Sequence, residues 1–424
     1  MTDDGDKFFE YVVIGTGILG SISYKVLTDK KFSTKVINVE DLPNLQNHKD
    51  NKFNFEKNTI FYGLGGTSNI WASTYDFYPK TYDLSYIDKL YTEKNFKSVE
   101  STLKFFNVPI AELQKNHFED KSYFLSDVPK QNINLAIRNR ELFKFEDIFN
   151  KIDLLNISLK NLKIDPINKV IQDKYSNKVI RYNKIILAAG GIGNPFLIDR
   201  YFTKNKNNGK NYMNHLKFSP LVFETNKFIK TSKVTGLRRT KDFELFPTYQ
   251  VENNSEGLIH SFRIYTALRS DVHPKSKTLI KVIDKIIRKF GFSKFFKVLV
   301  YTDMKPATNF LKFDNDNIIL NTSKDSTMNL IVSSISDIHH LLESHLKIKN
   351  VFINTDYVVR EGSHHIGTTI MGKNADEAVV DENLNLFGFK EVKVIGTSTL
   401  PAAGSGHPTL TAMILAILKL KSDF

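Results

Sequence analysis

Hydrophobic and polar positions follow two different periods along the chain, and the first change between them lies near the N-terminus. Residues 11–14 form a short apolar run, Gly15, Gly17 and Gly20 follow it, and apolar residues then recur every three or four positions. This order predicts a β-strand, a tight turn and a helix. A second apolar run ends at Glu40 and predicts the next strand.

The same change of period returns in the middle of the chain. Residues 182–198 begin as an apolar strand and run into Gly190, Gly191 and Gly193. Pro195 follows these glycines, and we expect it at the start of a helix because proline is tolerated in a first helical turn. The segment predicts a second strand, turn and helix.

A third glycine-rich segment precedes Trp71, the only tryptophan. Gly63, Gly65 and Gly66 lie within eight residues of it (71 − 63 = 8). Because glycine lets the backbone approach another group closely, this loop is expected to face something flat or charged. Three such turns in one chain favour a large cofactor that is held at several places.

Residues 277–297 carry a segregated amphipathic pattern. Their apolar residues fall within an arc of about 160° on a helical wheel and are Leu279, Ile280, Val282, Ile283, Ile286, Ile287 and Phe290. The opposite side carries Lys281, Lys285, Arg288 and Lys289. Two interpretations stay open: a helix packed on its own core or on another subunit with a solvated lysine face, or a helix on an anionic membrane that admits a lipid-linked substrate.

Composition narrows the class of protein. The chain has 424 residues, of which 41% are hydrophobic and 25% charged, as in soluble globular proteins of two or three domains. It has no cysteine, so disulfides and thiolate metal sites are excluded. No apolar run approaches the roughly 20 residues that span a bilayer, and the acidic N-terminus lacks the pattern of a secretory signal. We therefore expect a cytoplasmic protein, with peripheral membrane contact as the alternative.

The excess of basic residues has a plain explanation. The formal net charge is +13, but most of the basic residues are lysines scattered among asparagines. This distribution is typical of a compositional bias and not of a nucleic-acid surface. We expect no nucleic-acid partner.

The first turn has the spacing of a dinucleotide-binding site. In the G-x-G-x-x-G pattern, Gly15 permits the tight turn, Gly17 lets a pyrophosphate approach the backbone, and Gly20 lets the helix pack on the strand. Glu40 follows Gly15 by 25 positions (40 − 15), where a carboxylate can accept hydrogen bonds from a ribose. The turn alone leaves the kind of dinucleotide open.

Taken in order, the motifs resemble those of the glucose-methanol-choline (GMC) family of FAD-dependent oxidoreductases. They are GTGILG with Glu40, GLGGTSNIW, ILAAGGIGNP, GKNYMNHL, HHIGTTIMG, VVDENLNLFG and VIGTSTLPAAGSGHPTLTAMILAI. The resemblance implies an α/β fold with a Rossmann-like FAD-binding domain and a smaller α+β substrate domain. It assigns residues 1–75, 155–215 and 346–424 to FAD and residues 76–154 and 216–345 to the substrate domain and connecting segments.

The resemblance also implies the residues that hold the cofactor. They are Gly15, Gly17, Gly20, Glu40, Gly65, Gly66, Ser68, Asn69, Ala189, Gly190, Thr397, Pro408 and Thr409. Ile70 occupies the position where some members attach FAD through histidine, so noncovalent FAD is expected. Two further departures are Ile370, where an arginine is common, and Gly396, where an aspartate is common.

Two of the 11 histidines match the catalytic positions of the family. His364 fits the first position of an H-x-x-G-T motif, and His407 precedes Pro408 and the apolar stretch over residues 408–420, which predicts a closing helix. Neutral imidazole accepts a proton near neutral pH. We expect His364 as the base and His407 as its partner, with the reverse order left open.

The other histidines are expected to be structural or exposed. They include His365, His215, His339, His340 and His345. The last three lie in a helical pattern without an H-E-x-x-H motif, so no metal is expected.

The expected reaction is the oxidation of an alcohol, such as a sugar or polyol hydroxyl, to a carbonyl by hydride transfer to flavin N5. The partners would be a small-molecule alcohol or carbohydrate and an electron acceptor. A flavoenzyme that acts on another group, or a non-catalytic FAD-binding subunit, are the alternatives.

Overall fold

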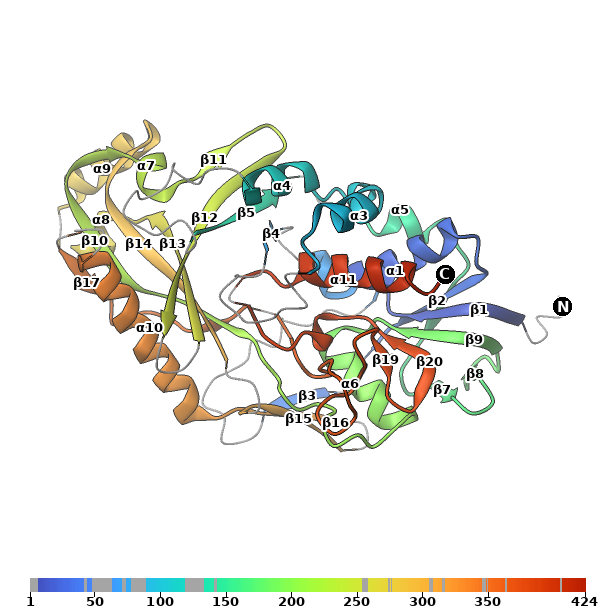
Figure 1. The fold of residues 1–424 in the computed structure, drawn as a ribbon. Helices are drawn as coiled ribbons and strands as arrows, with labels where there is room; N and C mark the ends of the chain where they lie inside the picture. Colours follow the sequence, from blue (N-terminus) through green and yellow to red (C-terminus); the bar gives the residue numbers. More distant parts are fainter. Residues whose placement is uncertain are drawn as a thin grey trace.

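The computed structural model describes residues 7–41, 44–47, 63–70, 74–77, 89–118, 133–140, 143–253, 258–273, 275, 277–304, 308–314, 317–344, 348, 350–362, 364–404 and 406–424. These residues form three sheets, two of which are large. Figure 1 shows one large sheet with the two termini of the chain and the other at the opposite end of the molecule.

The first large sheet has the strand order β19-β20-β9-β1-β2-β6, with β8 paired to β9 and β7 to β8. Its central strands β20, β9, β1, β2 and β6 are parallel. The strands are β1 (Lys7–Ile14), β2 (Thr34–Val39), β6 (Leu154–Ile157), β7 (Leu162–Asp165), β8 (Val170–Asp173), β9 (Val179–Leu187), β19 (Asn385–Leu386) and β20 (Phe389–Val394). The predicted α/β class with a parallel sheet is confirmed.

Helices from both ends of the chain cover this sheet. The closing helix α11 (Thr409–Lys421) lies against α1 (Ile18–Asp29) and α3 (Glu93–Phe105). Nine of the thirteen residues of α11 are buried, which explains why its sequence is apolar on all sides. α4 (Ile110–Phe118) and α5 (Glu146–Phe149) continue from α3.

Helix α6 (Gly190–Tyr201) starts earlier than the sequence predicts. Pro195 lies inside the helix and not at its start. A proline cannot donate the hydrogen bond that the carbonyl four residues earlier would accept. Here Thr368 donates its hydroxyl to that carbonyl, Gly191 O, at 2.6 Å, so the helix continues without an unsatisfied acceptor.

The second large sheet is mainly antiparallel, with the order β17-β10-β14-β13-β12-β5-β4. Its strands are β4 (Thr74–Tyr75), β5 (Ile133–Asn139), β10 (His215–Lys230), β12 (Phe243–Asn253), β13 (Leu258–Thr266), β14 (Phe292–Asp303) and β17 (Val351–Ile353), with β11 (Arg238–Arg239) and β18 (Arg360–Glu361) at its edges. Helix α10 (Lys324–Ser344) crosses one face and contacts β10, β12, β13, β14 and β17.

The remaining elements are short. β15 (Phe310–Asp314), β16 (Asn317–Asn321) and β3 (Asn44–Asn47) make the third sheet. The others are η2 (Gly66–Ile70), α7 (Thr231–Thr235), α8 (Arg269–Val272), α9 (Thr278–Lys289) and η4 (Thr397–Thr399). No helix among the described residues is long and apolar enough to cross a membrane.

Helix α9 does not pack as one interpretation of its amphipathic pattern predicts. None of its twelve described residues is buried, and the apolar side chains face solvent. The side chains that the protein partly covers are Lys281, Asp284, Ile287 and Arg288, and Asp284 pairs with Arg269, whereas Lys285 and Lys289 are exposed. The interpretation of a helix packed on its own core is therefore wrong.

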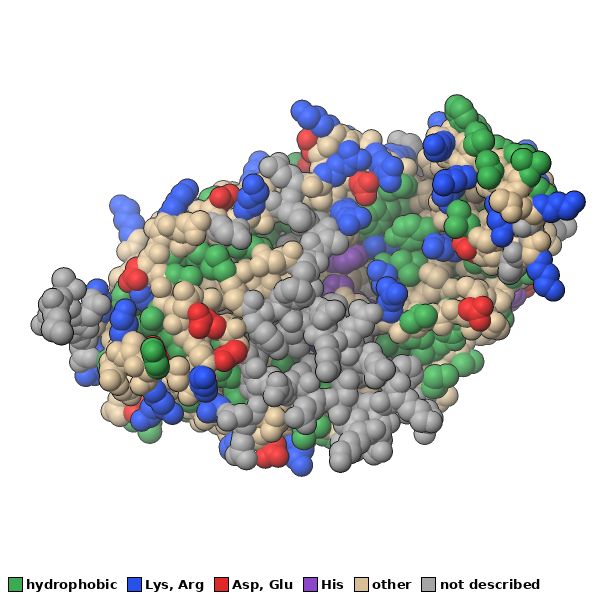
Figure 2. Space-filling view, turned by 180° about the vertical axis from the view of Figure 1, so that it is seen from behind, with side chains coloured by type: hydrophobic (Ala, Val, Ile, Leu, Met, Phe, Trp, Pro, Cys, Tyr) green, Lys and Arg blue, Asp and Glu red, His purple; other side chains and the backbone are tan. Residues whose placement is uncertain are grey.

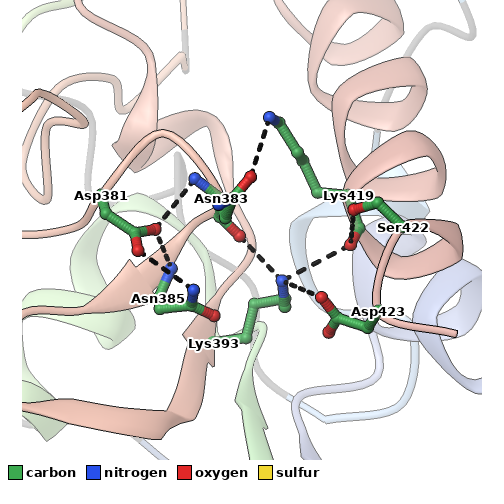
Figure 3. A network of polar contacts seen from close by, with 7 residues as sticks. All are labelled: Asp381, Asn383, Asn385, Lys393, Lys419, Ser422 and Asp423. Carbon is green, nitrogen blue, oxygen red and sulfur yellow. Dashed lines mark hydrogen bonds and ion pairs between the residues drawn. The ribbon is translucent and has the colours of Figure 1, made fainter.

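A buried lysine fixes the C-terminal end of the chain (Figure 3). Lys393 on β20 donates to Asn383 O at 2.7 Å and to Asp423 Oδ1 at 3.1 Å. Asp381 accepts hydrogen bonds from the backbone of Asn383 and of Asn385, within the segment VVDENLNLFG. This network joins the end of α11 to the edge of the first sheet.

Candidate active site

The turn after β1 has the geometry that its glycines predict. Gly15 has φ +115°, and a Cβ there would lie 2.3 Å from Ala188 O. A Cβ on Gly20 would lie 2.0 Å from Gly15 O. No larger residue fits at either position, so the turn between β1 and α1 depends on both glycines.

A loop from later in the chain closes over this turn. Ser68 Oγ accepts a hydrogen bond from the backbone of Ile18 at 3.0 Å. Thr16 Oγ1 lies 2.9 Å from Asn38 Oδ1 and accepts from the backbone of Gly65 at 3.2 Å. Asn69 donates to Leu64 O in the same loop. The glycine-rich turn after β1 and the glycine-rich loop before Trp71 therefore lie together.

The other candidate cofactor residues follow the same edge of the sheet. In a parallel sheet the carboxyl ends of the strands lie side by side, and β1, β2, β9 and β20 end at residues 14, 39, 187 and 394. Glu40, Ala189 and Thr397 come within three residues of three of these ends, and Glu40 is exposed.

Three helices begin near these segments. α1, α6 and α11 start after Gly17, Ala189 and Pro408, none of which caps its helix with its own side chain, and none of the three helices has an acidic residue in its first turn. The first N–H of α1, that of Ile18, donates to Ser68 Oγ. A helix N-terminus carries unpaired N–H groups and a partial positive charge. These helix ends suit the anionic groups of a dinucleotide, so the residues present fit FAD.

The later motifs meet at one point. A Cβ on Gly191 would lie 2.1 Å from His365 O, and the same carbonyl accepts the hydroxyl of Thr397 at 2.8 Å. Gly367 has φ +78° and packs against Asn211 O. Segments more than 150 residues apart thereby hold the H-x-x-G-T loop in place.

The fold brings the two candidate catalytic histidines together. The ring centroids of His364 and His407 are 5.7 Å apart, with the planes at 84°. Both residues are mostly covered, and the side chain of His407 is 14% exposed. Figure 2 shows histidine side chains at the bottom of a hollow, with hydrophobic and basic side chains at its border.

His407 is held by a buried carboxylate. Asp76 is 1% exposed and accepts from the backbone N–H of His407 at 2.6 Å; its other oxygen lies 3.2 Å from His407 Nδ1. Arg263 Nη2 lies 3.4 Å from the same Nδ1 and 3.9 Å from Asp76. A Cβ on Gly406 would lie about 3.0 Å from Asp76, so glycine admits this contact.

His364 packs against a second histidine that is itself paired with a carboxylate. The rings of His364 and His215 are 4.7 Å apart, and His215 Nδ1 lies 2.7 Å from Asp303 Oδ1. Asn214 Oδ1 accepts from the backbone N–H groups of both histidines. His215 Nε2 and His364 Nδ1 are buried, and neither has a hydrogen-bond partner among the described residues.

The surroundings keep both candidate histidines neutral near neutral pH. Burial, and then the neighbouring His215 and His407, hold the pKa of His364 well below its usual value of 6.5. Burial also lowers the pKa of His407, and Asp76 offsets part of that effect. The neutral form is the one that accepts a proton.

Comparisons with known proteins agree with this arrangement. Residues 317–416 match the family model described as GMC oxidoreductase. This part of the chain is similar to the C-terminal part of GMC oxidoreductases. The resemblance drawn from the motifs is confirmed, and with it the expectation of an enzyme of the oxidoreductase class.

Solved structures share the fold over the whole chain. Pyridoxine 4-oxidase from Mesorbium loti is 12% identical with a TM-score of 0.58, and each chain is covered to 99%. A variant of the Aspergillus oryzae RIB40 formate oxidase, studied for FAD modification, is 13% identical with a TM-score of 0.62 and 98% coverage of each chain. A comparison with curated proteins gave no significant match. At these identities the structures show the GMC fold alone.

Some sequence-based expectations lie outside this cluster. His339 and His340 lie on α10, where His339 approaches Glu343. Trp71, His345 and the side chain of Ile70 lie outside the described residues. Among the described residues, no group of three or more His, Asp and Glu side chains could hold a metal ion.

Four residues of the site were missed by the sequence analysis: Asp76, His215, Arg263 and Asp303. No motif marks three of them, because they lie in segments that match nothing in the family pattern. His215 is the next-to-last residue of the GKNYMNHL segment, and that position was the one signal available.

Proposed function

We propose that this protein is an FAD-dependent oxidoreductase that oxidises an alcohol to a carbonyl. The observation that carries the proposal is the pairing of His364 and His407. Asp76 binds His407, and His364 packs against His215, which is itself paired with Asp303. Two neutral imidazoles at this spacing can hold one substrate oxygen between them.

FAD would be held by the β1–α1 turn, the loop of Gly65, Gly66, Ser68 and Asn69, and the N-termini of α6 and α11. Glu40 would accept hydrogen bonds from the ribose. We infer noncovalent binding because Ile70 offers no nucleophile. When bound, FAD supplies the acceptor for the hydride that leaves the substrate carbon.

His364 is the base in this proposal, and His215 with Asp303 positions it. With its Nδ1–H donated to Asp303, His215 presents Nε2 as an acceptor toward the ring of His364. A small rotation then lets His364 donate its own Nδ1–H to His215 and offer Nε2 to the substrate hydroxyl. The carboxylate of Asp303 stabilises the imidazolium that forms when His364 takes the proton.

His407 holds the substrate oxygen from the other side. Asp76 accepts the Nδ1–H of His407 and so fixes its ring, and Arg263 pairs with Asp76. The opposite nitrogen is then free to face the substrate. The pair removes the hydroxyl proton while it keeps the carbon and its hydrogen oriented. We assign the role of base to His364 and not to His407 because His364 occupies the first position of the H-x-x-G-T motif and because His215 and Asp303 lie next to it.

The wall beside the pair favours a substrate with an acidic group, such as a hydroxy acid or sugar acid. Lys217 lies two residues after His215 on the same face of β10, and its ammonium is 5.9 Å from the ring centroid of Tyr301. Tyr301 accepts from Arg263 at 3.5 Å. Desolvation, and then Arg263, Arg360 and Arg138, lower the pKa of Lys217, which forms no ion pair with a described residue.

The experiment is anaerobic mixing of the purified, FAD-loaded protein with a panel of neutral alcohols, sugars and hydroxy acids. Loss of the oxidised flavin absorbance with one of them identifies the substrate class. Bleaching by ketones or activated C–C bonds alone would favour a flavoenzyme acting on another group. No bleaching by any compound would favour a non-catalytic subunit.

A further inference from the structure

Helix α9 carries an unusual exposed surface, which we call the α9 surface. Its apolar side chains protrude from the end of the second large sheet, and Leu279 and Phe290 are 71% and 77% exposed. Val282, Ile283 and Ile286 are each close to half exposed. Figure 2 shows hydrophobic and basic side chains side by side on this end of the molecule.

The orientation of α9 is the reverse of an ordinary surface helix. α9 contacts α8 and β14, and its partly covered side chains are Lys281, Asp284, Ile287 and Arg288, three of which are charged. Asp284 is fixed there by its ion pair with Arg269. A globular helix normally turns its apolar stripe inward. The apolar stripe of α9 is therefore available to something outside the chain.

The charge around the stripe is strongly positive. Residues 275–294 contain seven Lys or Arg and one Asp, and that Asp is the one paired with Arg269. The neighbouring turn adds Lys227, Lys230 and Lys233, and the backbone of Thr231 donates to Gly291 O at 2.8 Å. Lys294 lies 5.5 Å from the ring centroid of the exposed Phe228.

We propose that the α9 surface binds the anionic headgroups and outer acyl region of a lipid bilayer. Apolar side chains that protrude between lysines fit an interface where the chains enter the acyl boundary and the lysines meet negative headgroups. A second copy of the protein fits less well, because two such surfaces would bring their excess positive charges together.

The position of α9 separates lipid binding from catalysis. β14 begins at Phe292, next to the end of α9, and ends at Asp303, which belongs to the site. Its twelve residues span roughly 35 Å at about 3.3 Å each. The bound protein would hold its active site well away from the bilayer. The α9 surface would therefore anchor the enzyme to the bilayer, and the distance is too long for it to deliver a short lipid-linked substrate to the active site.

The test is cosedimentation of the FAD-loaded protein with vesicles at low salt. One set contains phosphatidylcholine alone, and the other contains roughly one third phosphatidylserine. We expect sedimentation with the anionic vesicles alone, and release as the salt concentration rises because the headgroup attraction is screened. No sedimentation with the anionic vesicles would overturn the proposal.

Two double variants test the two parts of the surface. Ile283→Glu with Ile286→Glu removes the apolar stripe, and Lys285→Glu with Lys289→Glu reverses two charges. Each should weaken binding to anionic vesicles at least tenfold. All four positions are exposed, so folding should be kept, and circular dichroism with FAD content checks this.

The matched controls are Ile167→Glu, which replaces an apolar side chain that is 87% exposed, and Lys160→Glu, which reverses a charge elsewhere on the surface. Both should sediment like the unaltered protein. Loss of binding in the controls as well would mean nonspecific charge attraction and would overturn the proposal. A concentration-dependent dimer that Ile283→Glu with Ile286→Glu converts to a monomer, without lipid binding, would assign the surface to a second copy instead.

Flavin reduction in solution is measured on the same variants. Because α9 lies outside the catalytic machinery, the rates should be unchanged. A failure of the proposed alcohol oxidation would leave the vesicle result intact, so the two proposals are tested separately.

Discussion

At the scale of single residues, His364 lies between two other histidines, His215 and His407, and each of these two contacts a buried aspartate. Asp303 pairs with His215, whose ring packs against His364, and Asp76 holds His407 directly. Each buried aspartate can stabilise a positive charge that forms on its histidine during proton transfer. This arrangement gives each residue a distinct and measurable role.

The pairing of Asp303 with His215 predicts that Asp303→Asn slows flavin reduction by about tenfold or more, because the imidazolium of His364 loses its distant carboxylate. An asparagine keeps the shape and a hydrogen bond to His215. The pH profile of flavin reduction should also change, with its acid limb at lower pH, since the pKa of His364 falls further. An unchanged acid limb with a lower rate would mean that Asp303 acts only on structure.

The lowered pKa values of His364 and His407 predict how stability depends on pH. Above about pH 6.5 both histidines are neutral in the folded and unfolded states. As the pH falls below 6.5, the unfolded chain takes up protons that the folded protein resists. Stability should then decline by up to about 1.4 kcal/mol per pH unit for each group.

Urea unfolding between pH 7 and pH 5 measures this decline. A variant with both His364→Gln and His407→Gln should lose part of it. An equal decline in the variant would assign the effect to other groups.

At this scale the sequence predicted the two histidines that lie in motifs and missed the groups that support them. The reason is physical: a charge contact between Asp76 and His407 joins residues 331 positions apart, and a single sequence carries no local signal for it. The same holds for Arg263, which reaches the site from the middle of β13.

At the scale of elements, the turn between β1 and α1 is the most constrained part of the cofactor site. Gly15→Ala places a Cβ against Ala188 O and also forces alanine to adopt φ +115°. We expect FAD affinity to fall at least tenfold because the turn must move. Gly388→Ala is the control, since Gly388 has φ +87° but open space around it. It should cost about 1–2 kcal/mol of stability and leave FAD binding unchanged.

The network around Lys393 predicts a different effect. Lys393→Met removes the buried ammonium that donates to Asn383 O and to Asp423 Oδ1 (Figure 3). Loss of one partner of a buried pair should lower the free energy of unfolding by about 3 kcal/mol. Lys390→Met, at an exposed position of the same strand, should change it little. Chemical denaturation compares the two, and equal effects would contradict a role for the network.

Elements with a strong period were predicted well, and their surroundings were not. The strand and helix around Gly15 and the closing helix α11 lie where the apolar pattern places them. Pro195 was misplaced because the hydroxyl of Thr368, 173 positions away (368 − 195), replaces the missing hydrogen bond. The orientation of α9 could not be derived either, since an amphipathic pattern does not say which side faces the protein.

At the scale of the whole molecule, the first large sheet gathers the cofactor motifs, and the second provides the wall of the site. The sequence predicted the first sheet because its turns need glycine. The second sheet has no such requirement, and the division into an FAD-binding domain and a substrate domain at the boundaries given above stays a prediction. The proposed catalytic pair lies where segments that follow both sheets meet, so the proposed function depends on the complete fold.

The most direct test is anaerobic stopped-flow reduction of the flavin by an identified alcohol, in the unaltered protein and in His364→Ala, His407→Ala and the double variant. The account predicts that FAD stays bound in all four proteins. Each single variant should be reduced at least about 10² times more slowly, and the double variant should lose less than the product of the two. Reduction at the unaltered rate in both single variants would contradict the assignment of the pair to alcohol oxidation.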